Sequence, residues 1–433
     1  MKMKAIVFAL TGLSLAAGPA KALTSTSDPT FFLRWGADQK KAHHIAGPVY
    51  KATGWSNTIL VETDEGNVII DTSLGMNAAR HKKFLGAVNG KPVTHVIITH
   101  GHGDHIGGLG AWLEGGAKFV AQENIVEFLH YQERLKGFFT RRNAAQFSFP
   151  LNEANASANP GNYAAKIPEG EFFADAYSFE QGGLTFELLH TPSETYDALT
   201  VWVPELEAAF TGDLYYESFP NIYTLRGTQP RWALDYVKSL DRVIALEPKL
   251  LVPSHGEPIK GKEKIRKVLT RYRDAILYVH DAVVAGMNEG KSVETLMREV
   301  KLPPALDVGE SYGRIDWSLR GIYEGYAGWF DGEAASMYPG GAENVAADLV
   351  DMSGGADAVA ALSGEKLAGG DAVSALRLAN MALAADPANK PALKARLASL
   401  EALLAAKRNF NETGWLTSAI KETRERLDAE EEM

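Results

Sequence analysis

The stretch Thr99–Gly108 reads THGHGDHIGG and follows a β-rich run that begins at Val93. It brings three imidazoles and one carboxylate close together on a turn. Zinc binds imidazole nitrogen and carboxylate oxygen, and catalytic zinc sites gather such ligands from the ends of several strands. Gly101 and Gly103 allow a tight turn, so alternate side chains can point at two neighbouring metals. We interpret the stretch as the centre of a metal site; the alternative is a histidine-rich surface turn that binds metal adventitiously.

Three later groups also stand at the ends of apolar runs. They are His190 after residues 184–189, Asp213 after residues 208–212 and His255 after residues 250–254. An isolated histidine is more often a core or surface residue than a ligand. Groups that recur at strand ends within one segment of alternating strands and helices favour a single shared site.

These segments, taken in order, resemble the metallo-β-lactamase superfamily. The resemblance is carried by the Thr-His-x-His-x-Asp-His run, the His190-Thr191-Pro192 turn, Thr211-Gly212-Asp213 and Ser254-His255-Gly256. It implies an α/β fold, an αββα sandwich in which helices cover two packed sheets and the metals lie at one edge.

The resemblance also implies two zinc ions and their ligands. The ligands would be His100, His102 and His190 for the first ion, Asp104, His105 and His255 for the second, and Asp213 between them. Asp104 and Asp213 are then the expected catalytic carboxylates. Asp71, after the strand predicted at residues 67–70, would orient a ligating histidine.

A second resemblance concerns the stretch Asn221–Gly227, which reads NIYTLRG. It is similar to the NLYTLRG signature of the alkyl sulfatases, which implies that Asn221, Tyr223 and Arg226 bind the substrate. A planar guanidinium with paired N–H donors suits a tetrahedral anion such as sulfate. The alternative for Arg226 is a structural salt bridge.

The alkyl sulfatases place glutamates at the third and bridging ligand positions, and this chain departs from that pattern. Here Asp213 fills the bridging place, and His190 precedes Glu194. Either His190 or Glu194 could therefore complete the first metal site. We favour His190 because it ends a predicted strand.

After Ile259 the sequence becomes helical, and residues 271–281 and 323–332 resemble the α-helical dimerisation domain of the alkyl sulfatases. We predict a catalytic domain over residues 23–260 and this domain over residues 261–433, which implies a homodimer. Helical runs on both sides of Asp386-Pro387 predict a hairpin of tetratricopeptide type, which must pack on other helices to bury its apolar face. Four aromatic residues at helical spacing would belong to the core, an apolar wall or a dimer contact. They are Tyr323, Tyr326, Trp329 and Phe330.

Residues 1–22 predict a cleavable signal peptide, with lysines at positions 2 and 4, a short apolar run and a small-x-small signal ending at Ala22. We therefore expect a periplasmic or secreted protein without stable membrane insertion. The chain contains no cysteine, which excludes disulfides and thiolate ligands. A net charge of −10 argues against nucleic acid as a partner, because phosphate backbones require basic surface.

The resulting hypothesis is an exported dinuclear-zinc hydrolase that cleaves alkyl or aryl sulfate esters, small anionic substrates, with a metal-activated water. A lactamase or lactonase, and a phosphodiesterase, are the enzymatic alternatives; a binding module built on the helical hairpin is the alternative from another class. Candidate proton donors to the leaving group are Tyr215, Tyr216 and His280. Residues 149–170 lack periodicity and predict a long loop beside the site.

Overall fold

The computed structural model of the protein describes residues 34–147, 167–341, 345–406 and 409–432. The predicted signal peptide and most of the loop predicted at residues 149–170 lie outside the described residues.

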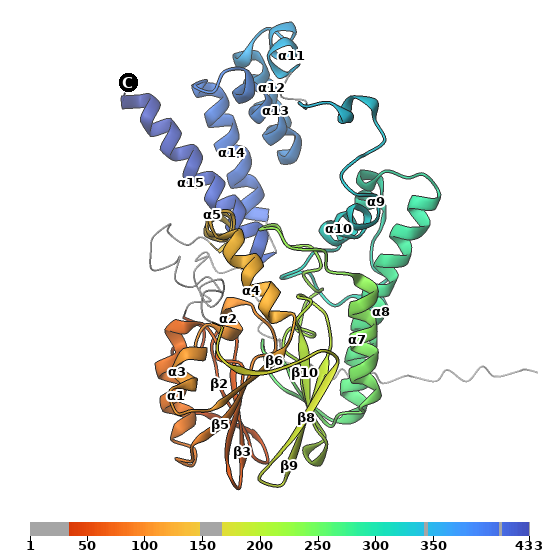
Figure 1. The fold of residues 1–433 in the computed structure, drawn as a ribbon. Helices are drawn as coiled ribbons and strands as arrows, with labels where there is room; N and C mark the ends of the chain where they lie inside the picture. The colour runs from red at the N-terminus through yellow and green to blue at the C-terminus, as the bar shows by residue number, and fades with distance from the viewer. Residues whose placement is uncertain (1–33, 148–166, 342–344, 407–408, 433) are drawn as a thin grey trace, which may run out of the picture.

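Two mixed β-sheets form the centre of the molecule (Figure 1). The first sheet has the order β1-β2-β3-β4-β5-β6-β7, and β4 to β7 run parallel. Its strands are β1 (His43–Ala46), β2 (Val49–Ala52), β3 (Thr58–Thr63), β4 (Gly66–Ile70), β5 (Val93–Ile97), β6 (Lys118–Gln122) and β7 (Gly170–Phe173). The second sheet has the order β13-β12-β11-β10-β9-β8. Its strands are β8 (Ala176–Gln181), β9 (Leu184–His190), β10 (Leu199–Val203), β11 (Ala208–Phe210), β12 (Leu250–Val252) and β13 (Ile259–Lys260).

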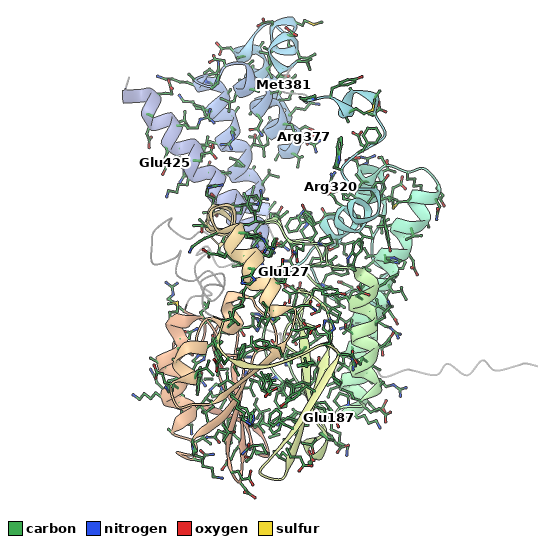
Figure 2. All side chains as sticks on the ribbon, viewed as in Figure 1. Glu127, Glu187, Arg320, Arg377, Met381 and Glu425 are labelled. Atoms are coloured by element: carbon green, nitrogen blue, oxygen red, sulfur yellow. The ribbon has the colours of Figure 1, made fainter. Side chains whose placement is uncertain are left out.

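Three apolar layers hold this centre together. Residues such as Val68, Phe186 and Val201 fill the space between the sheets, where Figure 2 shows side chains closely packed. The outer face of the first sheet is covered by α1 (Ala78–Gly86), α3 (Leu109–Leu113) and α4 (Ile125–Arg134). The outer face of the second is covered by α7 (Ala233–Ala245) and α8 (Lys262–Asn288). The predicted αββα sandwich is confirmed.

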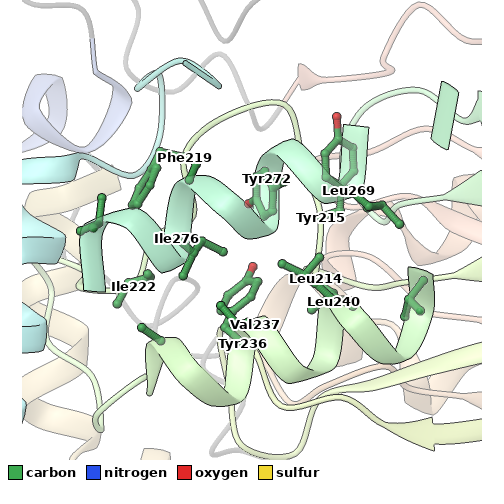
Figure 3. Packing of buried hydrophobic residues seen from close by; sticks show 14 of the residues in the cluster. Leu214, Tyr215, Phe219, Ile222, Tyr236, Val237, Leu240, Leu269, Tyr272 and Ile276 are labelled. Carbon is green, nitrogen blue, oxygen red and sulfur yellow. The ribbon is translucent and has the colours of Figure 1, made fainter. Parts of the chain in front are cut away.

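The largest apolar cluster joins α7 and α8 to the second sheet. Tyr236 and Leu240 of α7 pack against Leu269 and Tyr272 of α8 (Figure 3). The apolar spacing of three and four residues along α8 predicted this buried face. The cluster therefore continues across the boundary that we predicted between residues 260 and 261.

The C-terminal half is helical, as predicted, and includes α9 (Val293–Glu299) and α10 (Ile315–Ala327). A bundle follows, made of α11 (Ala346–Met352), α12 (Ala356–Ala368), α13 (Ala372–Ala385), α14 (Lys390–Ala406) and α15 (Phe410–Glu432). Helices α13 and α14 form the predicted hairpin, and its apolar face packs on α11, α12 and α15. None of the helices described is long and apolar enough to span a membrane.

Helix α15 returns to the sandwich and packs on α5 (Lys136–Phe147). The backbones meet where Gly414 lies against Gln146; a Cβ at Gly414 would lie 1.7 Å from the carbonyl oxygen of Gln146. Only glycine permits this approach.

Candidate metal centre

Six of the predicted ligands meet at one edge of the sandwich. His100 follows β5, Asp213 follows β11 and His255 follows β12. His102 precedes the short helix α2 (Gly103–Ile106), which carries Asp104 and His105. Parallel and adjacent strands end at the same edge, which explains how side chains so far apart in sequence are brought together.

The six residues, named here the strand-end ligands, form two groups. Within each group the potential ligand atoms lie within 4.8 Å of one another. The groups are His100, His102 and Asp213, and Asp104, His105 and His255. Asp213 lies between them, with Oδ2 3.7 Å from His100 Nε2 and Oδ1 3.3 Å from both His105 Nε2 and His255 Nε2. This is the intermediate position predicted for it.

The second ring nitrogen of the histidines is held by neighbouring groups. His105 Nδ1 lies 2.8 Å from Asp71 Oδ2, His255 Nδ1 donates to the carbonyl oxygen of Trp55 over 2.6 Å, and His100 Nδ1 lies 3.2 Å from Thr99 Oγ1. Their Nε2 atoms are thereby directed towards the centre, as in metal sites whose ligands are oriented by outer hydrogen bonds.

Asp71 occupies the predicted orienting position after β4. It is fully buried and also accepts hydrogen bonds from Thr99 N (2.8 Å) and Ser254 Oγ (2.6 Å), so it ties three strand ends together. Its φ of 58° lies in the left-handed region, which costs about 1–3 kcal/mol and is more typical of functional sites than of ordinary turns. Burial acts to raise the pKa of Asp71, but the attraction of His105 outweighs it and the pKa is lowered.

The protein without metal keeps positive charge in the second group. Burial acts to lower the pKa of both His105 and His255, yet Asp213 and Asp104 outweigh it. The pKa of His255 is raised to about 10, and that of His105 lies well above its usual value. Protons on these rings thus balance carboxylates that a cation would otherwise balance.

The residues present fit a metal pair. Imidazole nitrogens and carboxylate oxygens are the ligands that zinc prefers, and no thiolate competes. His105 Nε2 and Asp213 Oδ1 are buried and face each other, yet neither has a hydrogen bond to any described residue. Buried polar atoms without partners are rare and indicate a missing ligand or ion.

The structure does not bring His190 to this site. Its Nε2 donates to the carbonyl oxygen of Tyr196 over 2.7 Å, and its ring packs against the Tyr196 ring. Pairing of β9 with β10 continues up to His190, which lies opposite Leu199. The connection that follows projects beyond the strand ends and buries Glu194 instead. Our preference for His190 over Glu194 is corrected by this geometry.

Glu194 is buried beside the first group. Its Oε2 lies 2.8 Å from Arg231 Nη1, and its Oε1 accepts a hydrogen bond from the Tyr216 hydroxyl. Burial raises the pKa of Glu194, with Arg231 acting in the opposite direction and Asp213 adding to the rise.

Residues 221–231, named here the anion loop, lie on the other side of His102. Arg226 Nη2 is 3.2 Å from His102 Nε2, and Asn221 is fully buried. Tyr223, the third predicted substrate contact, packs against Gly321 of α10. It therefore also has a structural role. Burial lowers the pKa of Arg226, and the nearby charge of Arg231 adds to this.

Two residues of this region were absent from the sequence-based prediction. Gln146 Oε1 accepts hydrogen bonds from Arg226 N (2.8 Å) and Trp415 Nε1 (3.3 Å), which links α5, the anion loop and α15. Arg231 pairs with Glu194, as described above. Gln146 has no motif that could have revealed it, whereas Arg231 stands only five positions after Arg226.

A cavity of about 540 Å³ opens beside Asp213 and His255. Its wall is largely aromatic and apolar and includes Trp35, Trp55, Tyr215, Val268, Tyr272 and Tyr312. Its size is within the range of pockets that enclose small organic ligands. Of the predicted proton donors, Tyr215 and Tyr216 border this cavity, whereas His280 hydrogen-bonds Tyr326 and Asp281 on α10 and α8.

The aromatic residues at helical spacing are divided. Tyr323 packs on the core formed with α8, whereas Tyr326, Trp329 and Phe330 are exposed. Core packing therefore explains only Tyr323.

Comparison with known proteins gives two family matches. Residues 54–255 match the model of the metallo-β-lactamase superfamily, and residues 292–426 match that of the alkyl sulfatase dimerisation region. The first match contains all six strand-end ligands, and the second runs from the start of α9 into α15.

Individual relatives agree with these matches. A linear primary-alkylsulfatase from a Pseudomonas strain is 31% identical over 86% of this chain and 74% of its own length. An (R)-specific secondary-alkylsulfatase from Pseudomonas is 26% identical over 84% of this chain and 60% of its own length. A solved structure of a double mutant of the secondary alkylsulfatase PisA1 superposes with a TM-score of 0.79, at 25% identity, over 89% of this chain and 65% of that chain. The chain thus spans roughly three-fifths to three-quarters of these relatives. Together with the sandwich and its strand-end ligands, the matches show that the chain belongs to the alkyl sulfatases of the metallo-β-lactamase superfamily.

Proposed function

We propose that the protein is a dinuclear-zinc hydrolase that releases inorganic sulfate from alkyl or aryl sulfate esters. The observation that carries this proposal is the position of the anion loop. Arg226 lies 3.2 Å from a strand-end ligand, so a guanidinium and a metal pair can act on the same oxyanion. The relatives named as alkylsulfatases support the same substrate class.

The chain's own residues would divide the work. When bound, the metal pair supplies a water of lowered pKa and polarises an ester oxygen. Asp213 lies between the two ligand groups and can accept a proton or hydrogen bond from that water. Arg226 and Asn221 orient the sulfate, and the cavity beside Asp213 accepts the organic part of the ester.

Glu194 takes the place that His190 was predicted to hold, as the third ligand of the first group. Two observations support this role: Glu194 is buried, and the charge of Asp213 helps to raise its pKa. The alkyl sulfatases also place a glutamate at the third ligand position. Tyr216, which hydrogen-bonds Glu194 and borders the cavity, is the better-placed candidate among the predicted proton donors.

The substrate class is tested by a panel assay on zinc-loaded protein. Release of sulfate from a primary alkyl sulfate and an aryl sulfate is measured beside hydrolysis of a lactam, a lactone and a phosphodiester. Sulfate release should exceed the other activities by orders of magnitude. Preferential opening of the lactam or lactone would contradict the proposal, since neither substrate needs Arg226.

We also propose export and dimerisation. The signal at residues 1–22 supports export, and a native protein whose mass corresponds to a start at Leu23 would test it. Exposed apolar side chains on the segment between α10 and α11 support dimerisation, with Trp329 79% and Tyr338 69% exposed within the matched dimerisation region. Trp329→Glu should shift the sedimentation of the dimer towards monomer; an unchanged value would place the contact elsewhere.

A further inference from the structure

The cavity beside Asp213 has two cations on its wall that the proposed cleavage does not use. Lys264 and Arg271 of α8 both line the cavity, and both side chains are exposed, so they stand where the cavity meets solvent. Val268, which lies between them in sequence, lines the same cavity. Residues three and four positions apart share one face of a helix, so Lys264, Val268 and Arg271 form a single stripe along the wall. The two charged residues are named here the cationic rim.

The charges of the cationic rim are not compensated by neighbouring residues. Neither Lys264 nor Arg271 has an ion pair or a hydrogen bond within the part of the chain that the structure describes. Arg273, two positions further along α8, is by contrast paired with Asp241 at 2.6 Å. Exposed cations on most helices are simply solvated, but these two border a cavity whose other end lies at the metal centre. Charges of one sign beside a cavity of low polarity attract a ligand of the opposite sign.

Two carboxylates also border the cavity, and they do not cancel the rim. Glu257 is paired with Lys51 at 2.7 Å, so its charge is already compensated. Glu217 lies near Tyr215, since it adds to the effect of burial in raising the pKa of Tyr215, whereas Arg271 lowers that pKa. Two cations thus stand against one uncompensated carboxylate, which leaves a net positive charge at the opening.

The wall between the metal centre and the cationic rim is aromatic. The ring of Trp55 packs edge-on against that of His255, with centroids 5.5 Å apart, and Tyr215 packs in the same way against Tyr272 at 5.1 Å. Such a wall accepts an apolar or aromatic group. A ligand whose sulfate is held at the metal centre would therefore lay its organic body along these rings. Its far end would then lie near the cationic rim.

We propose that the preferred substrate is a sulfate ester whose organic part carries a second anionic group, such as a carboxylate, and that Lys264 and Arg271 bind this group. The inference rests on the proposed function, because that function places the sulfate at the metal centre. Arg271 can offer paired N–H donors to a carboxylate, and Lys264 offers a compact charged donor. The two cations thus determine specificity and take no part in breaking the ester bond.

The first test compares three aryl sulfates that differ only in the group opposite the sulfate: carboxymethyl, ethyl or aminomethyl. Sulfate release by zinc-loaded wild-type protein is measured for each. We expect kcat/KM to be about 10-fold higher for the carboxymethyl ester than for the ethyl ester, mainly through a lower KM, because the second anion gains charge-assisted hydrogen bonds at a partly solvated site. The aminomethyl ester should be the poorest substrate. A wild type that does not prefer the carboxymethyl ester would overturn the proposal.

The second test removes the cationic rim with the double variant Lys264→Met and Arg271→Met. The ratio of kcat/KM for the carboxymethyl ester to that for the ethyl ester should fall about 10-fold, and added salt should reduce this ratio in the wild type but not in the variant. The matched control is Arg266→Met, which removes an exposed cation of α8 that does not line the cavity and should keep the wild-type ratio. An unchanged ratio in the double variant, or an equal fall in the control, would overturn the proposal. Protein that releases sulfate from none of the three esters would instead contradict the proposed function, so the two failures are distinguishable.

Discussion

The strand-end ligands and the anion loop face each other across His102 but are held in opposite ways. The ligands stand on strand ends and are oriented by Asp71, Thr99 and Trp55, all within or next to the first sheet. The anion loop has no regular structure and is held by side chains of one helix, α5, that is distant from it in sequence. Gln146 donates to Thr224 and accepts from Arg226 N, and Arg142 donates to the carbonyl oxygens of residues 225 and 226.

Because the two regions have separate supports, we infer that metal binding and substrate selection can be changed separately in this molecule. A change at a strand end should alter the number of metals bound. A change in the supports of the anion loop should alter substrate affinity while the metals stay in place.

The largest effect is expected at Asp213, which lies between the two ligand groups. Asp213→Asn keeps the shape but removes the negative charge that both groups share. We expect a loss of about 1000-fold or more in kcat/KM together with fewer zinc ions per chain. Plasma emission analysis of dialysed protein gives the metal content. A variant that retained both ions and its activity would refute the role of Asp213 as a group shared by the two metal sites.

Arg226→Ala should impair the anion loop without affecting the strand-end ligands. Loss of a preorganised donor to the developing charge typically costs about 100- to 1000-fold in rate, and we expect that loss with unchanged zinc content. The matched control is Arg134→Ala, which removes an exposed arginine paired with Glu127 on α4. Equal activity of the two variants would refute the role of Arg226.

A smaller effect is expected from Gln146→Leu, because it touches the anion loop only through hydrogen bonds. Arg226 N and Trp415 Nε1 both lose their acceptor. We expect a KM increase of about 10-fold and a loss of about 1–3 kcal/mol in the free energy of unfolding, with zinc affinity unchanged. Trp415→Phe, which removes one of these hydrogen bonds, should give a weaker form of the same result. A fall in zinc content would show that the two sides are coupled more tightly than we infer.

The smallest effect is expected in α1, which covers the outer face of the first sheet. His81 of α1 is buried against Thr58 and Thr53, and burial lowers its pKa to about 4. The unfolded chain therefore binds a proton more readily than the folded protein as pH falls from the ordinary value of about 6.5 towards 4. Between pH 7 and pH 5 the wild type should lose about 1–2 kcal/mol relative to His81→Gln. The free energies of unfolding are measured by chemical denaturation at both pH values. An equal difference between the two proteins at pH 7 and pH 5 would contradict the lowered pKa of His81.

The sequence allowed the metal centre to be predicted because its information is local. Each ligand follows an apolar run, and runs that pair in one sheet end at one edge. The error at His190 has the same origin: the rule that a ligand ends a strand ignores connections that project past the edge, as residues 191–198 do to bury Glu194. The supports of the anion loop were not predictable in this way, since no periodicity relates Gln146 to Trp415. Arg231 offered a weak signal as a second arginine in the same loop.

The contact between Gly414 and the backbone of Gln146 joins the C-terminal helix α15 to α5 of the sandwich. Gln146 and Trp415 are 269 residues apart in sequence, yet they share the hydrogen bonds that position Arg226. We therefore expect a molecule whose C-terminal bundle has unfolded to keep the strand-end ligands in place but to bind the proposed substrate poorly. The catalytic rate should therefore depend on whether α15 has packed in its native position on α5.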